Sequence, residues 1–561
     1  MRNLAKLSMA AGFSALAAIG AHAQNFGESC GCPSLGARTP VTLNNASSPG
    51  LVNPNNEFIG NVTLTCGNTY TCNTKLYVMA GNTLTIEPGT VLKWADNSGV
   101  NSNALIVTRG GQIVADGSES CPIIMTSTSD PLDGSYAVTN RGKWGGLILL
   151  GNAQNNVQHT DQKDAGGVGT STSIVPPASP ANNGLAVIEG LVNTDSRHYY
   201  GALGGAFNNT ESSGILRHVA LRHGGELLGT ANEINGLTMG GVGSGTVIEY
   251  VEVTSNLDDA FEFFGGTVNA KHLVAMHCDD DYIDYDQGYT GKLQFIFGLQ
   301  GPDNLSGGAN NQGDNGIECD GDDGPGNTDP LKSNPTIYNA TIFGRWTSTG
   351  GSGDESLEVR REAKGTIANS IFANFRSGIS LATSGGDVSY ANWSPGNDFN
   401  VLNCTFQIRA DQTDVDPTSS FKRVRVAGAN ASPADYTLFG TDNNLSVAFG
   451  SLVDASFATT LVSAGPPPVY NNTVTDRVNP IPAFGQATTS LLPPSDGFFT
   501  KAAYRGAFEP GGESWLPRWS MARTMGTDKT TFDCKGDLNG DYIVNSADFS
   551  TFVGRFGSNC N

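Results

Sequence analysis

Four short acidic segments of one design recur in the middle of the chain and indicate its fold. They are residues 258–263 (DDAFEF), 280–285 (DDYIDY), 314–319 (DNGIEC) and 354–359 (DESLEV). In each segment, which we call an acidic box, a carboxylate stands between two apolar residues. This alternation is typical of a half-buried β-strand, whose apolar side chains point inward while the acid points outward. If successive boxes pair as neighbouring strands, their acids form a ladder with a spacing of ~4.8 Å.

Such an acidic ladder carries a cost that cations would offset. Like charges at that spacing repel each other by roughly 1 kcal/mol in water and by several times more in a drier groove. The four boxes hold eleven carboxylates, so we expect one or more Ca²⁺ ions to bind between them. The expected ligands are Asp258, Asp259, Asp280 and Asp281, followed by Glu262 and Asp284. The alternative is a solvated face without ions, because stacked polar residues are tolerated and many aspartates simply make turns.

A second, looser calcium loop is a further possibility that the sequence leaves open. Residues 320–329 (DGDDGPGNTD) place oxygen side chains at short intervals. The alternative interpretation is a disordered turn.

Each acidic box is accompanied by a second strand-like segment, and the two together define a repeat. Tyr250 precedes Glu262 by twelve residues, and His272 precedes Asp284 by the same interval. Related segments are centred on His218, Asn339, Asn369 and Asn403. A repeat of about 22 residues with short strands and no helical period predicts an all-β parallel β-helix. We interpret His218 and His272 as members of a turn-side stack rather than as metal ligands. The ladder should end near Thr238 and Ser380, where hydroxyls replace acids.

The composition agrees with an elongated, turn-rich β-protein. The 561 residues include 72 glycines, and only 15% are charged, which favours a solenoid over a helical protein. The formal net charge of −21 makes nucleic acid an improbable partner.

The N-terminus has the pattern of a secretory signal peptide. Arg2 and Lys6 precede an apolar run over residues 7–20, and an Ala-x-Ala site follows at 21–23. We therefore expect residues 1–23 to be removed and the protein to be secreted. No later run reaches the ~18 apolar residues of a membrane span. The expected regions are a leader or cap over 24–75, the β-helix over 76–430, the last coils with a cap over 431–530, and a separate tail over 534–561.

The ten cysteines suggest disulfides in a secreted chain. The expected bridges are Cys66–Cys72 and Cys534–Cys560, because each pair brackets a short segment. Cys30 and Cys32 are too close in sequence to pair comfortably with each other. The pairing of Cys121, Cys278, Cys319 and Cys404 cannot be assigned from the sequence.

The tail contains a pattern with the spacing of an EF-hand calcium loop. Oxygen donors stand at positions 1, 3, 5, 9 and 12 of a twelve-residue loop, and position 7 offers a backbone carbonyl; these ligands are Asp537, Asn539, Asp541, Asn545 and Asp548, with Ile543 at position 7. An amphipathic apolar stripe follows over residues 549–556. The loop resembles one dockerin repeat of the single-repeat, cysteine-bracketed GC type. The resemblance implies a sorting or surface-attachment module. A single repeat makes a cohesin-like partner doubtful.

The middle of the chain also carries a family resemblance. Residues 76–127, 142–153 and 235–298 resemble a family of secreted bacterial right-handed parallel β-helix proteins that is largely uncharacterised. The resemblance implies fold and secretion but no particular activity. A late segment, residues 504–519, is similar to the closing part of these proteins, and we expect it to cap the last coil.

Two functions remain open at this point. The first is a secreted, surface-attached, calcium-binding protein with a binding, adhesive or structural role toward a polysaccharide or another component of the cell envelope. The second is a polysaccharide lyase or glycoside hydrolase, for which Arg360 and Arg361 are the nearest candidates for an arginine base. No complete catalytic constellation is present. A recess with an arginine or paired acids would favour the enzyme, and a flat exposed ladder would favour the binding protein.

Overall fold

The computed structural model describes most of the chain between Phe26 and Thr524. The described residues are 26–97, 102–133, 135–158, 173–174, 184–192, 194–229, 232–301, 314–322, 329–344, 355–393, 398–408, 412–413, 421–427, 429–447, 453, 478–483, 485, 487–516 and 519–524. The expected signal peptide and the expected dockerin-like tail lie outside these ranges. No described helix is long and apolar enough to cross a membrane.

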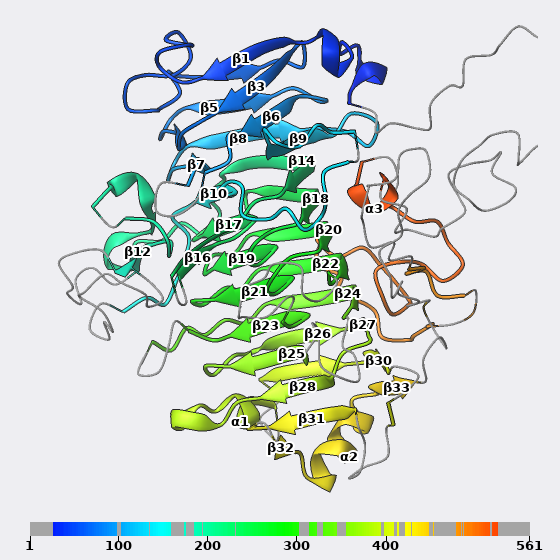
Figure 1. Ribbon diagram of the computed structural model, residues 1–561. Helices are drawn as coiled ribbons and strands as arrows, with labels where there is room; N and C mark the ends of the chain where they lie inside the picture. Colours follow the sequence, from blue (N-terminus) through cyan, green and yellow to red (C-terminus); the bar gives the residue numbers. More distant parts are fainter. Residues whose placement is uncertain are drawn as a thin grey trace, which may run out of the picture.

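Two long sheets of almost entirely parallel strands form the body of the molecule, as the stacked arrows of Figure 1 show. The 11-stranded sheet consists of β4 (Leu76–Val78), β7 (Leu105–Val107), β10 (Leu147–Leu150), β17 (Leu237–Gly240), β19 (Phe261–Phe264), β21 (Ile283–Asp286), β23 (Ile317–Asp320), β25 (Glu355–Arg360), β28 (Ser377–Leu381), β31 (Lys422–Val426) and β32 (Ala429–Asn430). The chain alternates between the two sheets, so each coil buries its apolar side chains against the next one. This architecture confirms the expected parallel β-helix.

The 17-stranded sheet forms the other wall. Its strands are β1 (Thr39–Leu43), β2 (Val62–Leu64), β3 (Asn68–Cys72), β5 (Thr83–Ile86), β6 (Val91–Trp94), β8 (Gln112–Asp116), β9 (Ile123–Ser127), β14 (Gly214–Arg222), β18 (Val247–Thr254), β20 (Asn269–Met276), β22 (Lys292–Leu299), β24 (Thr336–Phe343), β26 (Gly365–Ala368), β27 (Ile371–Ala373), β29 (Phe399–Leu402), β30 (Thr405–Gln407) and β33 (Leu445–Val447). Because β1 and β2 already pair with strands of this sheet, the coils begin well before residue 76. Residues 39–75 are therefore part of the β-helix and not only a leader.

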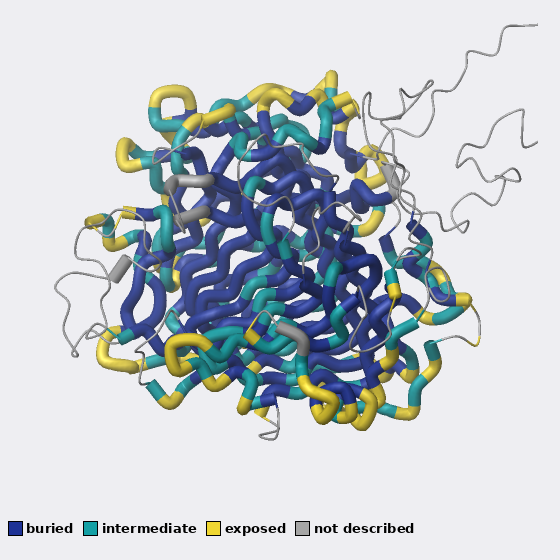
Figure 2. The backbone as a smooth tube through the Cα atoms, turned by 60° about the horizontal axis from the view of Figure 1, so that its bottom comes forward, coloured by how far each residue is buried: buried dark blue, intermediate teal, exposed yellow. Residues whose placement is uncertain are grey.

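Smaller elements decorate this body. They are the strands β11 (Ser173–Ile174), β12 (Leu185–Val187), β13 (Tyr199–Gly201), β15 (Glu226–Gly229) and β16 (Asn232–Ile234), the 3-10 helices η1 (Glu28–Cys30), η2 (Leu35–Ala37), η6 (Ser196–His198), η7 (Leu203–Gly205) and η8 (Ser384–Gly386), and the α-helices α1 (Ser389–Trp393), α2 (Pro433–Thr441) and α3 (Met521–Thr524). Helix α2 closes the C-terminal end of the solenoid, where Phe439 packs on Phe406 with ring centroids 5.4 Å apart. Figure 2 shows the coils as buried and the outer turns as exposed.

The 17-stranded sheet bends at one left-handed residue in each of seven successive coils. These residues, which we call the corner stack, are His218, Tyr250, His272, Phe295, Asn339, Asn369 and Asn403, with φ between 47° and 60°. The first four rings stack face to face, with centroids 4.6, 4.1 and 5.0 Å apart. The turn-side stack expected from the sequence is thus confirmed. Phe295 was missed because a bulky residue seldom adopts this conformation, which Asn adopts several times more readily.

The late segment around residues 487–524 does not cap the last coil, contrary to the expectation. It runs along the outside of the corner stack, and we call it the strap (orange in Figure 1). The Asn339 and Asn369 amides donate to the carbonyls of Tyr504 and Leu491, at 2.9 Å each. The strap and the outer face of the 17-stranded sheet also share a second apolar core, whose members include Val274, Met276, Phe297, Leu299, Phe508, Leu516 and Trp519. Docking of this core holds the strap on the side of the solenoid.

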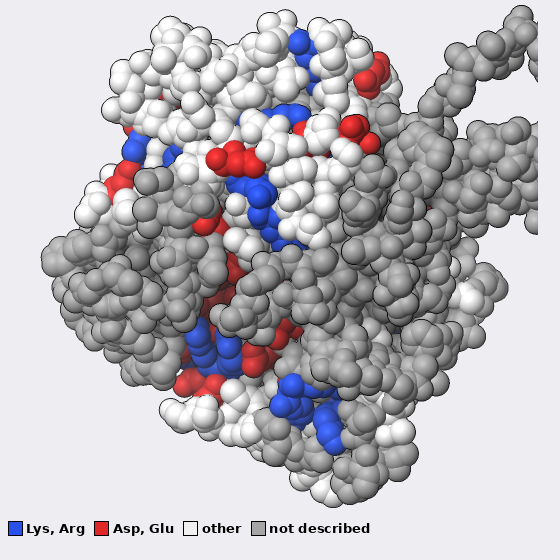
Figure 3. Space-filling view, in the orientation of Figure 1, with Lys and Arg blue, Asp and Glu red and all other residues white. Residues whose placement is uncertain are grey.

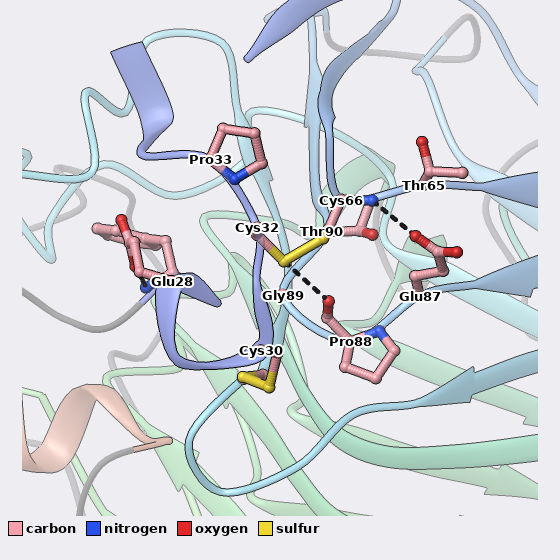
Figure 4. Close-up of a disulfide and its surroundings, with 12 residues drawn as sticks. Glu28, Cys30, Cys32, Pro33, Thr65, Cys66, Glu87, Pro88, Gly89 and Thr90 are labelled. Carbon is pink, nitrogen blue, oxygen red and sulfur yellow. Dashed lines mark hydrogen bonds between the residues drawn. A yellow bond between two sulfur atoms is a disulfide. The ribbon is translucent and has the colours of Figure 1, made fainter. Parts of the chain in front are cut away.

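Two disulfides tie the N-terminal segment to the first coils. Cys30 is bonded to Cys121, and Cys32 is bonded to Cys66. Figure 4 shows the second bridge, beside which the Cys66 N–H donates to the Glu87 carboxylate at 3.1 Å. The expected Cys66–Cys72 bridge is therefore wrong. Cys72, at the end of β3, is buried in the core of the solenoid, whereas Cys66 is bonded to Cys32 of the N-terminal segment. The expected Cys534–Cys560 bridge lies outside the described residues.

The remaining described cysteines should be inert in the native protein. Cys72, Cys278, Cys319 and Cys404 are free and fully buried, and burial raises the pKa of the Cys278 and Cys404 thiols to about 12. Since the thiolate is the reactive form, a thiol reagent should label none of the four at neutral pH without denaturant, and all four after unfolding. Mass spectrometry of labelled peptides measures this; fast native labelling of any of them would contradict the packing.

Candidate functional site

The acidic ladder is present in the structure with the register that the box spacing predicts. Successive strands of the 11-stranded sheet pair Thr238 with Glu262, Glu262 with Asp284, Asp284 with Glu318, Glu318 with Glu358, and Glu358 with Ser380. Both hydroxyl ends lie where the sequence placed them. One strand further on, Arg425 follows Ser380.

Half of the described acids of the boxes are buried and the other half are partly buried, which argues against a fully solvated face. Asp258 and Asp259 are each 7% exposed, Glu262 is 5% exposed and Asp281 is 2% exposed. Figure 3 shows acidic atoms set back from the surface at the middle of this face, with basic atoms close below them. A buried carboxylate is costly unless an opposite charge or hydrogen bonds compensate it.

The upper half of the ladder brings acids from adjacent coils within reach of a single ion. Ligand oxygens of Asp258, Asp259 and Asp280 lie within 4.8 Å of one another, as do those of Asp259, Glu262 and Asp284. The two triads share Asp259. The structure therefore assembles five of the six ladder residues that the sequence offered as calcium ligands, whereas Asp281 belongs to neither triad.

Asp281 and Asp259 have a second role, in a hydrogen-bonded column that links the coils. The Asn235 side chain accepts the N–H of Asp259 at 3.1 Å, and the Asp259 carboxylate accepts the N–H of Asp281 at 2.8 Å. Asp281 accepts the N–H of Asn315, which in turn accepts the N–H of Glu355 at 3.3 Å. Asparagine performs this task at two of the four accepting positions. The column therefore needs an oxygen acceptor at Asp259 and Asp281 but not a negative charge.

Burial and mutual repulsion raise the pKa of the upper acids. The pKa of Asp259 lies well above its usual value, first through burial and then through Asp258. The pKa of Glu262 and that of Asp280 are raised in the same way. Burial raises the pKa of Asp284 to about 8, and that of Asp281 to about 6 against the opposing effect of the hydrogen bond from Asn315. The raised pKa values mean that the folded protein holds protons on these groups to higher pH than usual, and a divalent cation would take the place of those protons.

The lower half of the ladder is compensated by arginines. Arg360 pairs with Glu318, with Asp320 at 3.0 Å and with Glu358 at 3.5 Å. Arg361 pairs with Asp320 at 3.1 Å and with Asp286 at 3.8 Å. The repulsion that the sequence led us to expect is thus offset here by the protein itself.

The looser calcium loop at residues 320–329 is compensated in the same manner where it is described. Asp320 binds both arginines, and Asp322 pairs with the buried Lys332. These pairs engage both carboxylates with basic side chains and therefore argue against a calcium loop in its described part. Residues 323–328 lie outside the described residues, as do all ligands of the expected tail loop.

Sequence reasoning missed one acid of the site. Glu189 follows β12 in the lobe beside the ladder, and it is the neighbour that most strongly raises the pKa of Glu262, after burial itself. It stands in no acidic box, and its approach depends on the docking of β12 and β13 against Ile148, Leu150 and Phe264. No local sequence pattern predicts such a contact.

Comparison with known proteins agrees with this architecture. The profile of the pectate-lyase-like β-helix domain family matches residues 56–172 and 181–443, which is more than half of the chain. No curated protein and no solved structure matches the chain significantly. The matched span contains every strand of the 11-stranded sheet and the whole acidic ladder.

Proposed function

The chain belongs to the pectate-lyase-like β-helix domain family, and from this premise we propose that it binds an extracellular polysaccharide through calcium held by the upper half of the acidic ladder. The observation that carries the proposal is the pair of carboxylate triads sharing Asp259. Ca²⁺ takes six to eight oxygen ligands at about 2.3–2.6 Å. Three carboxylates leave part of that shell for hydroxyl or carboxylate oxygens of a glycan.

The inter-coil column supports a cation at these two coils in particular. The acceptor is an asparagine in the coils of Asn235 and Asn315 and an aspartate at Asp259 and Asp281 between them. Since the hydrogen bond does not need the charge, the charge serves another purpose. Asp258 and Asp280 stand beside the same two positions and add charge there. A bound divalent ion accounts for Asp258, Asp259 and Asp280 together.

The direct test is a panel of polysaccharides assayed with calcium and with a chelator. We expect retention of at least one acidic polysaccharide with calcium, and its loss with the chelator. Asp280→Asn should weaken retention at least tenfold, because it removes one charge from a triad. Asp398→Asn is the matched control, since this acid is 52% exposed and its ion pair among the described residues is with Lys364 at 3.1 Å. Retention that ignores both calcium and Asp280→Asn would contradict the proposal.

A lyase or hydrolase activity is the second candidate, and the placement of Arg360 favours it. The arginine shares the recess with the acids, and burial together with Arg361 lowers its pKa, as a general base requires. An arginine beside acids that are set back from the surface is the arrangement that we expected for an enzyme. A binding protein was expected to have a flat, exposed ladder. Against it, Arg360 is already engaged by three carboxylates.

The same panel separates cleavage from binding when product release is read alongside retention. Cleavage that Arg360→Lys abolishes while calcium-dependent retention persists would establish the enzyme. Retention without any product in the unmodified protein supports the binding role alone.

Secretion and surface attachment are part of the proposal, and they rest on the sequence of the two ends. Deleting residues 534–561 should release the protein from the cell surface into the medium, as cell fractionation measures. An unchanged distribution would remove the attachment role of the tail and leave the ladder proposal untouched.

A further inference from the structure

The strap meets the aromatic half of the corner stack with its tryptophans. Trp519 lies edge-on to His218 and Tyr250, with ring centroids 5.7 and 5.9 Å apart. Trp515 lies edge-on to His272 and Tyr250, at 5.2 and 6.3 Å. Two histidines are therefore held between stacked rings on one side and the strap on the other. Their rings are the titratable part of an otherwise apolar contact.

The two histidines are poorly placed to carry a proton while the strap is docked. The Nδ1 atom of His218 is buried and has no hydrogen-bond partner among the described residues. The Nδ1 atom of His272 lies 3.5 Å from the Glu249 carboxylate, which also faces Arg217 at 3.5 Å. For His218, a charged Nδ1–H without an acceptor is costly in a buried site; for His272, the cost is the burial of the charge, which Glu249 offsets only in part. Lifting the strap would return both rings to water and remove that cost.

We propose that the strap is an acid-released latch, whose docking on the corner stack weakens when His218 and His272 take up protons. The released state would expose the outer apolar face of the 17-stranded sheet, including Phe297 and Leu299, which Phe508 and Leu516 cover in the docked state. The latch would give a secreted protein a surface that becomes available to apolar partners only in acid.

The charged groups around the histidines set the direction of the effect. His218 faces Arg217 on its own strand, Asp116 of β8 and Glu249 of β18; His272 faces Lys271 on its own strand and Glu249, and the strap contributes Asp496 beside Lys271. Burial outweighs the acids, so the pKa of His218 falls to about 4 and that of His272 falls below its usual value. A lowered pKa in the docked state means that docking is complete above pH ~6.5 and weakens as the pH falls toward 4.

Hydrogen exchange of the strap, read by mass spectrometry on the full chain and corrected for the intrinsic effect of pH, tests the latch. We expect exchange in peptides of residues 487–516 to rise about tenfold or more between pH 7 and pH 4, while β10 stays protected. The matched variant is His218→Asn with His272→Asn, because Asn339, Asn369 and Asn403 occupy the same left-handed corner. Its strap should show no such rise.

Three results would overturn the latch. They are a strap that stays equally protected at pH 4, a rise shared equally by β10, and a rise of the same size in the double asparagine variant. If that variant fails to fold, His218→Phe with His272→Phe replaces it, since Phe295 occupies the corner in the same conformation. The phenylalanine variant is judged by the same three outcomes.

Discussion

Replacing Trp519 with alanine is expected to lower the free energy of unfolding by about 3–5 kcal/mol, the usual cost of removing a buried Trp or Phe side chain. Trp519 belongs to the strap, and its side chain is fully buried in the apolar core that the strap shares with the 17-stranded sheet. Its indole N–H donates to the Trp515 carbonyl at 2.9 Å. The substitution leaves a cavity at the junction of strap and corner stack. Urea unfolding followed by circular dichroism measures the change.

The strap should also govern how cooperatively the molecule unfolds. Solenoid coils contact only their neighbours, so an array without cross-links tends to fray coil by coil. The strap binds the corner stack from His218 to Asn403 and couples these coils. We therefore expect Trp519→Ala to broaden the unfolding transition as well as to shift it. Leu492→Ala, at a strap side chain that is 40% exposed, is the control and should change little. Equal effects of the two substitutions would contradict the account of the strap.

Replacing Asp259 with asparagine is expected to stabilise the calcium-free protein at pH 9 by about 1–3 kcal/mol and to remove its response to calcium. The amide oxygen still accepts the Asp281 N–H, as Asn235 and Asn315 do for their neighbours. The substitution therefore keeps the column and deletes one charge from both triads. A change that stabilises the empty protein while abolishing ion binding is a signature that simple damage to the fold does not produce.

The pH dependence of the unmodified protein follows from the same groups. The folded pKa of the Asp259 and Asp284 carboxyls is raised, so the folded protein keeps these protons to a higher pH than the unfolded chain, which loses them near pH ~4. As the pH rises from 7 toward 9, the folded protein must release protons that the unfolded chain has already lost, and stability falls. Calcium should reverse this fall. Thermal unfolding in chelator and in calcium at pH 7 and pH 9 measures both effects; stability in chelator that is flat over this range, or Asp259→Asn that responds to calcium normally, would contradict them.

The parts of this fold that could be predicted follow from the short-range spacing of similar segments along the sequence. The interval between boxes fixed the strand register, the ladder from Thr238 to Ser380, and the corner position shared by Tyr250, His272 and the asparagines. These features recur in successive coils, so the position of a residue in one coil predicts the position of its counterpart in the next. The compensation of the lower ladder by Arg360 and Arg361 was not anticipated, although both residues were recognised as the nearest bases, because ion pairing depends on side-chain positions that spacing does not specify.

Contacts between distant segments were beyond the reach of the sequence. Cys66 pairs with Cys32 and not with the nearby Cys72, because the N-terminal segment folds back over the first coils. The segment around Trp519 lies along the side of the solenoid and not over its end, because the apolar outer face of β20 and β22 offers it a core there. Glu189 reaches the ladder only through the docking of its lobe. Each of these outcomes is decided by burial between elements far apart in the chain.

Calcium titration by calorimetry is the most direct test of the central claim that the upper ladder is a cation site. The protein should be the full mature chain carrying Asp537→Ala and Asp541→Ala, so that the tail loop contributes no heat. The account predicts calcium binding in this protein, and its loss when Asp259→Asn and Asp280→Asn are added. No heat at millimolar calcium, or heat that survives both ladder substitutions, would contradict it.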